Sequence, residues 1–308
     1  MMKEKVLMSE VATLYYKKNM TQQEIAERMH LTRQSVSKLL NDAIEEKIVE
    51  IIIHSPANDC RDLERQICDS FGIRNCIACS VSGRNTLTHR TMVVKAAVDY
   101  VLPLVQKGNQ KIAISWGRTI QEFINVFPET GTIQNMVFPL FGATDTEHSY
   151  FSSNELARKL ADKLNATPKC AWFPYLAESE QDCNLIKQLS CYRKIQELWD
   201  SADLAILGIG NVEILEIFGE VFGYSDIHTQ VVGDVATHFF DKDGNVLNLY
   251  ENTLCAPVNS IQNAKQTIAI ACGNEKAEAI AGALRTNVID TLITDEYTAR
   301  KILEYGLE

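Results

Sequence analysis

The stretch from Thr21 to Leu40 constrains the fold of this chain more than any other part of its sequence. Thr21 and Glu24 have the S/T-x-x-E spacing of a capping box, which marks the start of a helix. Thr32 belongs to the residue types that cap a helix, and His30 falls where a turn would precede it. The sequence therefore predicts two short helices joined by a tight turn.

The second predicted helix, which runs to about Asp42, separates apolar from polar residues. Val36, Leu39 and Leu40 recur at helical spacing and are expected to face inward. The N-terminal end of a recognition helix meets base edges and phosphates, and here it is polar and partly basic. The residues expected to contact DNA are Thr21, Thr32, Arg33, Gln34, Ser35, Ser37 and Lys38. An ordinary helical hairpin is the alternative, but caps, apolar spacing and turn length together favour a DNA-binding helix-turn-helix.

The flanking residues extend this module on both sides. Residues 6–16 have the pattern of a preceding helix, and the β-branched run that ends at Ile53 predicts a strand directly after the pair. A strand in this place is typical of a wing. We therefore expect a winged helix-turn-helix DNA-binding domain in residues 1–55, followed by a larger effector and oligomerisation domain in residues 56–308.

Charge is distributed unevenly along the chain. The whole sequence carries a net charge of −10, which opposes nonspecific binding to nucleic acid. Residues 17–41 nevertheless hold five lysines and arginines against two glutamates, a local balance of +3. Screening over about 8 Å lets this local charge act despite the acidic remainder. Because so few cations bind DNA weakly, we expect a homodimer or homotetramer that uses paired half-sites.

Several other classes of protein are disfavoured. No apolar run approaches the ~20 residues of a membrane helix, and the N-terminus does not have the shape of a signal peptide. The nine cysteines are scattered, and Cys76 and Cys79 form the only C-x-x-C pair, without a second pair at zinc-binding distance. We interpret these two as small core residues. The expectation is a cytoplasmic protein with reduced thiols, no metal site, no cofactor and no contact with a membrane.

Beyond about Arg61, short apolar runs alternate with amphipathic helices. This alternation is typical of an α/β fold in which helices cover a mainly parallel sheet. The predicted strands are residues 111–114, 135–141, 203–207, 267–271 and 291–294.

Glycines follow several of these predicted strands. They are Gly117, Gly142, Gly208 with Gly210, and Gly273. In open α/β sheets, ligands bind beyond the carboxyl ends of the strands, and a following helix N-terminus favours an anion. The Ser115–Thr119 loop adds two hydroxyls and a guanidinium that can grip a phosphate. A glycine after a strand often serves only a tight turn, but several at equivalent strand ends favour a common anion site.

The chain as a whole, from about Leu7 to Leu303, resembles the SorC family of transcriptional regulators, a DeoR-like group with a sugar-binding effector domain. The resemblance is carried by residues 21–26, 116–119, 207–210, 233–236 with 240–244, 276–285 and 292–299. It implies a Rossmann-like effector domain with the fold of phosphosugar isomerases and CoA transferases. It further implies binding of phosphorylated sugars or related metabolites and, commonly, assembly into tetramers.

The resemblance also assigns roles to individual residues. It places Arg118 and Thr119 at the phosphate, Asp234 at sugar hydroxyls and Lys276 at the ligand. The complete set expected at the effector comprises Ser115, Trp116, Gly117, Arg118, Thr119, Gly142, Gly210, Asn211, Asp234, Gly273 and Lys276. Trp116 and Arg118 stand where some relatives have smaller residues, and residues 152–154 replace a Gln-Ala-Asn run of certain phosphosugar binders. The identity of the effector does not follow from the sequence.

An enzyme remains the alternative. Asp234 could act as a base and Lys276 could form a Schiff base, as in isomerases of related fold. A hydroxyl acceptor and a charge contact are expected instead, and no catalytic residue is assigned. The capped recognition helix favours a regulator of carbohydrate metabolism genes over a sugar-phosphate isomerase or transferase with an accessory helical domain.

Overall fold

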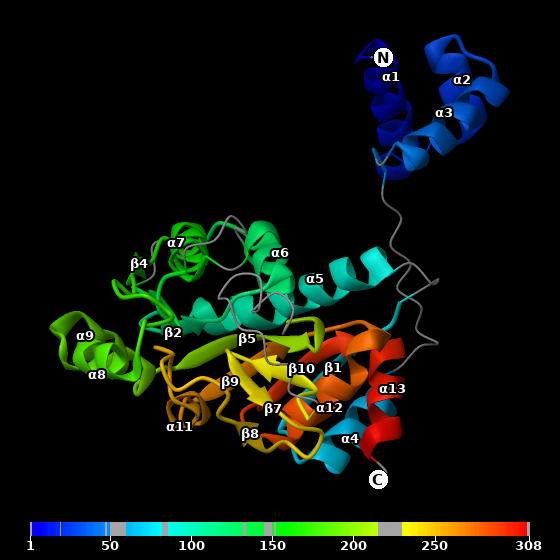
Figure 1. Ribbon diagram of the computed structural model, residues 1–308. Helices are drawn as coiled ribbons and strands as arrows, with labels where there is room; N and C mark the ends of the chain where they lie inside the picture. Colours follow the sequence, from blue (N-terminus) through cyan, green and yellow to red (C-terminus); the bar gives the residue numbers. More distant parts are fainter. Residues whose placement is uncertain are drawn as a thin grey trace. The chain divides into compact units, whose positions relative to one another are not determined.

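The computed structural model describes residues 2–18, 20–46, 48–49, 60–81, 86–131, 134–144, 150, 152–214 and 230–306. The chain divides into two compact units, Met1–Asn58 and Asp59–Glu308 (Figure 1). The division expected after residue 55 falls among residues 51–59, and the predicted wing strand ends at Ile53. Both predictions lie outside the described residues.

The smaller unit is a set of short helices around its own apolar core. Its elements are α1 (Met2–Ala12), the π-helix η1 (Thr13–Lys17), α2 (Gln22–Met29) and α3 (Arg33–Glu45). The buried side chains are Val11, Ala12, Ile25, Ala26, Val36, Leu40 and Ala43. Leu39 packs against this core half-buried, so the predicted apolar stripe of the second helix is confirmed.

Both predicted helix caps are present. The Thr21 hydroxyl accepts a hydrogen bond from the Glu24 backbone N–H at 3.2 Å, and the Glu24 carboxylate accepts one from the Thr21 N–H at 2.8 Å. The Thr32 hydroxyl accepts from the Ser35 N–H at 3.1 Å. His30 ends α2 in the left-handed region, with φ of 54°. The helix-turn-helix geometry thus follows from local side-chain to backbone bonds.

The larger unit contains a parallel sheet with the strand order β1-β10-β9-β5-β2-β3-β4. Its strands are β1 (Asn75–Cys79), β2 (Lys111–Ile114), β3 (Met136–Pro139), β4 (Thr167–Pro168), β5 (Leu204–Asn211), β9 (Gln266–Ile270) and β10 (Thr291–Asp295). The central strands are buried on both faces, as expected for a parallel sheet between helices.

Helices cover both faces of this sheet (Figure 1). One layer contains α5 (Thr86–Val105), α6 (Arg118–Val126) and α7 (Ser153–Leu164). The other contains α4 (Arg61–Phe71), α12 (Ala277–Arg285) and α13 (Glu296–Gly306). The other helices among the described residues of this unit are α8 (Glu180–Gln188), α9 (Ser190–Trp199), α11 (Val258–Gln262) and the 3₁₀ turn η3 (Asn274–Lys276). The α/β architecture predicted from the alternating pattern is confirmed.

Strand β5 departs from the sequence prediction. Residues 208–211 were expected to form a glycine loop, but they continue β5 to Asn211. Gly208 still pairs parallel with Ile270 of β9, and residues 209–211 pair antiparallel with β6 (Gly233–Val235). The strands β7 (His238–Phe240) and β8 (Val246–Leu247) follow in the same antiparallel extension.

No helix in the part of the chain that the structure describes is long and apolar enough to cross a membrane.

Buried Asn135 ties the amino ends of β2 and β3 to the end of α5. Its Oδ1 accepts from the Gln110 N–H and its Nδ2 donates to the Val105 carbonyl, both at 2.9 Å. Replacing it by alanine leaves both backbone groups without these partners, so we expect Asn135→Ala to lower the free energy of unfolding by about 2–3 kcal/mol in urea titrations. Gln134→Ala, at the exposed neighbouring position, is the control. Equal stability of the two variants would contradict this role.

Candidate functional site

A cavity of about 210 Å³ opens at the carboxyl ends of β2, β5 and β9 in the larger unit. This is the edge of the sheet where a ligand was predicted. It is lined by the predicted residues Trp116, Gly117, Arg118, Thr119, Gly210, Asn211, Asp234 and Lys276. The structure therefore brings together side chains that lie up to 160 positions apart in the sequence.

The loop after β2 presents Arg118 at the start of α6. Gly117 has φ of 117°, a conformation that favours glycine, and its N–H donates to the Tyr150 carbonyl at 2.9 Å. The Arg118 guanidinium lies over the Tyr150 ring, 5.2 Å from its centroid, and the side chain is exposed. An exposed guanidinium on an aromatic surface is available to an anionic ligand while the ring limits its motion.

Two other residues of the same loop serve the framework. Trp116 is buried against Phe141 and Tyr175, with ring centroids 4.4 and 5.6 Å away. Ser115 does not line the cavity. Its buried hydroxyl accepts the Gly208 N–H at 2.9 Å and so joins β2 to β5. The ligand contact expected of Ser115 stays a prediction, and in the structure its hydroxyl bonds the backbone of β5.

Gly142 and Gly273 also lie away from the cavity lining. A Cβ atom at Gly142 would come within 2.3 Å of the Pro174 carbonyl oxygen, so this glycine permits a close backbone approach. Gly273 has φ of 116°, and its N–H donates to the Thr298 hydroxyl at 2.8 Å. Both residues fit the turn role that glycine after a strand often has.

Asp234 is the buried carboxylate of the cavity, with 3% of its surface exposed. It lies opposite Gly210 across the β5–β6 pair, where a Cβ atom would stand 2.1 Å from its Oδ1. Its Oδ2 accepts the Thr237 N–H at 3.2 Å, in the turn between β6 and β7. Burial raises the pKa of Asp234 to about 6, because the carboxylate is desolvated.

Lys276 approaches the cavity from the turn before α12. Its Nζ donates to the Ile209 carbonyl at 3.0 Å. Burial lowers the pKa of this ammonium, since desolvation disfavours the charged form, although Asp234 and Glu275 oppose the effect. The side chain is half-buried and held in place, which suits a fixed charge contact with an anion.

Sequence reasoning missed Arg90, which reaches the cavity from α5. Its Nη1 lies 3.1 Å from Glu122 Oε1 on α6. No local pattern distinguishes this arginine from a solvated helix residue, so only the packing of α5 on α6 reveals it. The other lining residues outside the predicted set are Ile120, Tyr150, Gly208, Ile209, Glu213, Ile214, Cys272 and Glu275.

The charges of the lining are mixed. Arg90, Arg118 and Lys276 are its cations, and Asp234, Glu213 and Glu275 are its carboxylates. Cations can hold an anionic group, while carboxylates accept hydrogen bonds from hydroxyl groups. A small molecule with one anionic group and several hydroxyls matches this combination.

The cysteines show no arrangement for metal binding. All nine are free thiols, and Cys76 and Cys79 lie in β1. Burial raises the pKa of Cys79 to about 12, so its thiol stays protonated. Within the described ranges, no group of three or more histidine, cysteine, aspartate or glutamate residues could hold a metal ion.

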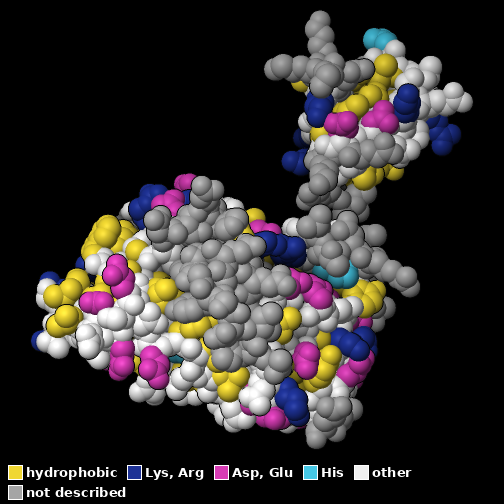
Figure 2. All heavy atoms as spheres, in the orientation of Figure 1, with side chains coloured by type: hydrophobic (Ala, Val, Ile, Leu, Met, Phe, Trp, Pro, Cys, Tyr) yellow, Lys and Arg dark blue, Asp and Glu magenta, His cyan; other side chains and the backbone are white. Residues whose placement is uncertain are grey.

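The predicted DNA-binding residues divide into two groups in the structure. The hydroxyls of Thr21, Thr32 and Ser35 are used locally, because Thr21 donates to Glu24 and Thr32 lies 2.8 Å from the Ser35 hydroxyl. Gln34 and Lys38 are exposed on α3, and Ser37 beside them is half-buried. Figure 2 shows lysine and arginine side chains at several places on the visible face of this unit.

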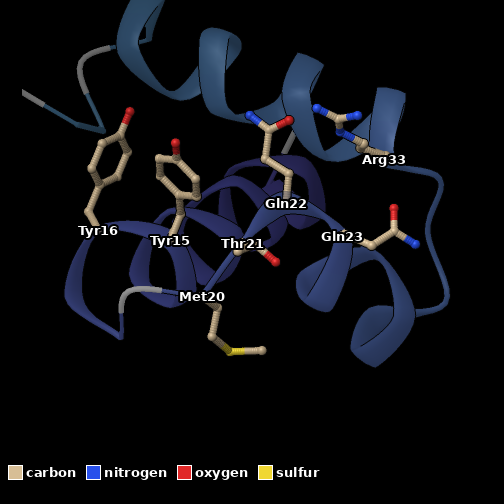
Figure 3. Close-up of a pocket in the computed structure, with 7 residues that line it drawn as sticks. All are labelled: Tyr15, Tyr16, Met20, Thr21, Gln22, Gln23 and Arg33. Atoms are coloured by element: carbon tan, nitrogen blue, oxygen red, sulfur yellow. The ribbon is translucent and has the colours of Figure 1, made fainter.

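A groove of about 650 Å³ lies between the end of η1, the start of α2 and the start of α3. We call it the helix-turn-helix groove. Its lining comprises Tyr15, Tyr16, Met20, Thr21, Gln22, Gln23 and Arg33 (Figure 3). Of these, only Thr21 and Arg33 were predicted to contact DNA. A tyrosine pair next to the capping box is the sequence signal that could have revealed the rest.

We expect the free energy of unfolding to depend on pH because Asp234 is buried. The folded-state pKa of about 6 exceeds the ordinary value of 3.8, so the folded chain keeps a proton that the unfolded chain loses. The resulting stabilisation is full below about pH 4 and is lost as the pH rises through about 6, an effect on the order of 3 kcal/mol. Urea titrations from about pH 4.5 to about pH 7.5 should show parent stability falling relative to Asp234→Asn.

The control for this measurement is Asp243→Asn, at an exposed carboxylate in the turn between β7 and β8. Its stability difference from the parent should not vary with pH over the same range. A constant difference between the parent and Asp234→Asn would show that Asp234 is not desolvated as described.

Comparison with known proteins places this architecture in a family. Residues 55–304 match the model described as "Putative sugar-binding domain", and residues 11–58 match that of the MarR family. The sorbitol operon regulator of Klebsiella pneumoniae is 29% identical over 97% of this chain and 98% of its own length. The deoxyribonucleoside regulator of Bacillus subtilis is 24% identical over 96% of both chains.

A solved structure agrees with these matches. The full-length sorbitol operon regulator SorC from Klebsiella pneumoniae superposes with a TM-score of 0.72 at 27% identity, covering 98% of this chain and 99% of that one. These relatives are transcriptional regulators, and the similarity extends over both units, so the alternative of a sugar-phosphate isomerase or transferase is not supported. The chain belongs to the SorC family of transcriptional regulators, with a helix-turn-helix unit and a sugar-binding domain.

Proposed function

We propose that this regulator binds operator DNA of carbohydrate metabolism genes and that a phosphorylated sugar or related metabolite controls its operator affinity. One observation carries the proposal: a single cavity combines Arg118, Lys276 and the buried carboxylate of Asp234. Cations and a hydroxyl acceptor at the carboxyl edge of the sheet suit a sugar phosphate better than an apolar ligand. Relatives named for sorbitol and deoxyribonucleoside regulation support this class of effector.

The proposed ligand lies across the cavity. Its anionic group meets Arg118 and Thr119 at the start of α6, where the helix N-terminus also favours negative charge. Its hydroxyls extend toward Asp234, whose carboxylate accepts hydrogen bonds, and Asn211, whose amide can accept or donate them. Lys276 closes the opposite side.

The smaller unit is proposed to read the operator through α3. Gln34, Ser37 and Lys38 lie on the N-terminal half of this helix, where base edges and phosphates are within reach. Thr21, Thr32 and Ser35 support it indirectly, since their hydroxyls hold the two helix ends. We place this DNA-binding domain in residues 1–55 and the effector and oligomerisation domain in residues 56–308, and we propose that the protein acts in the cytoplasm.

Removal of either Arg118 or Lys276 should weaken the binding of the effector. A charge-assisted hydrogen bond contributes about 1.5–3 kcal/mol, so Arg118→Ala and Lys276→Ala should each lower the affinity for a responsive sugar phosphate by about ten- to one-hundred-fold in calorimetry. DNA binding without effector should persist, because neither residue lies in the smaller unit. Arg193→Ala, at an exposed site on α9, is the matched control. Unchanged affinity in both variants would show that the effector binds at a different site.

The larger unit should assemble without the smaller one. Symmetric half-sites require at least a dimer, and the larger unit has by far the larger surface on which subunits can associate. We therefore expect a fragment of residues 56–308 to remain oligomeric in sedimentation. A monomeric fragment would assign the association to the DNA-binding unit instead.

A further inference from the structure

The helix-turn-helix groove has a composition suited to an anion. Among the described residues that line it, Arg33 is the one cation and none is a carboxylate. The cavity of the larger unit differs in this respect, because its cations stand beside aspartate and glutamate. Lys17 and Lys18, which follow the two tyrosines in the sequence, are exposed.

Hydrogen-bonding groups of the groove are left without partners inside the described part of the unit. The hydroxyls of Tyr15 and Tyr16, the amide of Gln22 and the guanidinium of Arg33 make no hydrogen bond or ion pair there. Figure 3 shows these four side chains extending to the same side of the unit. Gln23 differs, since its amide donates to Glu27 at 3.0 Å. The groove therefore presents a set of unused donors from three helices.

The π-helix η1 places the tyrosines at this groove. The Lys18 N–H donates to the Thr13 carbonyl at 3.2 Å, five residues back, which widens the last turn of the first helix. The rings of Tyr15 and Tyr16 meet edge to face with centroids 4.9 Å apart, so each limits the motion of the other. Such π-helical turns often mark functional positions.

The position of Arg33 on α3 separates it from the outward face. It precedes the buried Leu40 by seven residues, so the two share one stripe of the helix. Gln34 and Lys38 lie four residues apart on a different, exposed stripe. Arg33 is exposed because it is the first residue of α3 and lies beyond the buried residues Val36 and Leu40 of the small core. Its side chain consequently reaches the groove rather than the outward face.

We propose that the helix-turn-helix groove holds a phosphate of the DNA backbone, with Arg33 supplying the charge and Tyr15, Tyr16 and Gln22 donating hydrogen bonds. Arginine, tyrosine and glutamine are among the usual phosphate donors in protein–DNA contacts. The capping box already uses the N–H groups of Thr21 and Glu24, so those two backbone donors are not available to the phosphate. The inference rests on the proposed DNA binding. It gives Arg33 the role of positioning the protein on the DNA duplex rather than of recognising bases.

The test compares affinity, selectivity and salt dependence in the full-length chain. The probes are a duplex selected by the parent protein from a random pool and a scrambled duplex of the same composition, followed by fluorescence anisotropy. Arg33→Gln should weaken both duplexes by the same factor, about tenfold, and reduce the slope of log affinity against log salt by about 0.9 per half-site. Tyr16→Phe should weaken both by a smaller common factor, with the slope unchanged.

Two comparison variants make the result specific. Gln34→Ala should weaken the selected duplex more than the scrambled one, as a base contact requires. Arg65→Gln removes the same charge from an exposed site on α4 and should change nothing. If Arg33→Gln weakens only the selected duplex, Arg33 reads a base and the inference is wrong. If neither Arg33→Gln nor Tyr16→Phe changes binding, the groove is not a phosphate site. Failure of the parent to select any duplex would refute the proposed DNA binding itself.

Discussion

The pairing of Gly210 with Asp234 across β5 and β6 is the contact on which the cavity depends. Any side chain at position 210 would force the Asp234 carboxylate to move, because a Cβ atom would lie 2.1 Å from its Oδ1. The same extension of β5 offers the Ile209 carbonyl to Lys276. One antiparallel step at the end of a parallel strand thus fixes a carboxylate and an ammonium on the same wall. Both groups are desolvated there, which makes their charges more effective toward a ligand than in water.

The elements of the larger unit could be predicted because their sequence pattern is local. Residues 111–114 are mostly apolar and form β2 over the predicted bounds, and the predicted strand of residues 291–294 lies within β10. The end of β5 could not be predicted in this way. Gly208 and Gly210 have the composition of a loop, and only their partners in β9 and β6 make them strand residues.

In the candidate site, too, a local sequence pattern does not determine which residues contact the cavity. Gly117 and Gly142 both follow a strand, and both have the sequence signal of a ligand loop. Only Gly117 lines the cavity, because the backbone of Pro174 already fills the space in front of Gly142. Arg90 is the opposite case, a lining residue that the sequence did not predict. An arginine within a helix has no sequence pattern that marks it as a ligand contact, and only the packing of α5 on α6 brings it to the cavity. Proximity that arises from tertiary packing cannot be deduced from spacing along the chain.

The smaller unit illustrates how local bonds divide a polar surface into separate roles. Its caps, turn and apolar stripe were all visible in the sequence, because each depends on residues fewer than five positions apart. The sequence treats the start of α3 as one polar face. The structure splits it: Thr32 and Ser35 bond to each other, Gln34 and Lys38 face outward, and Arg33 stands over the inward stripe beside the tyrosines. A helix that begins directly above a small core must direct its first side chain along the edge of that core, and here the edge is the groove between helices.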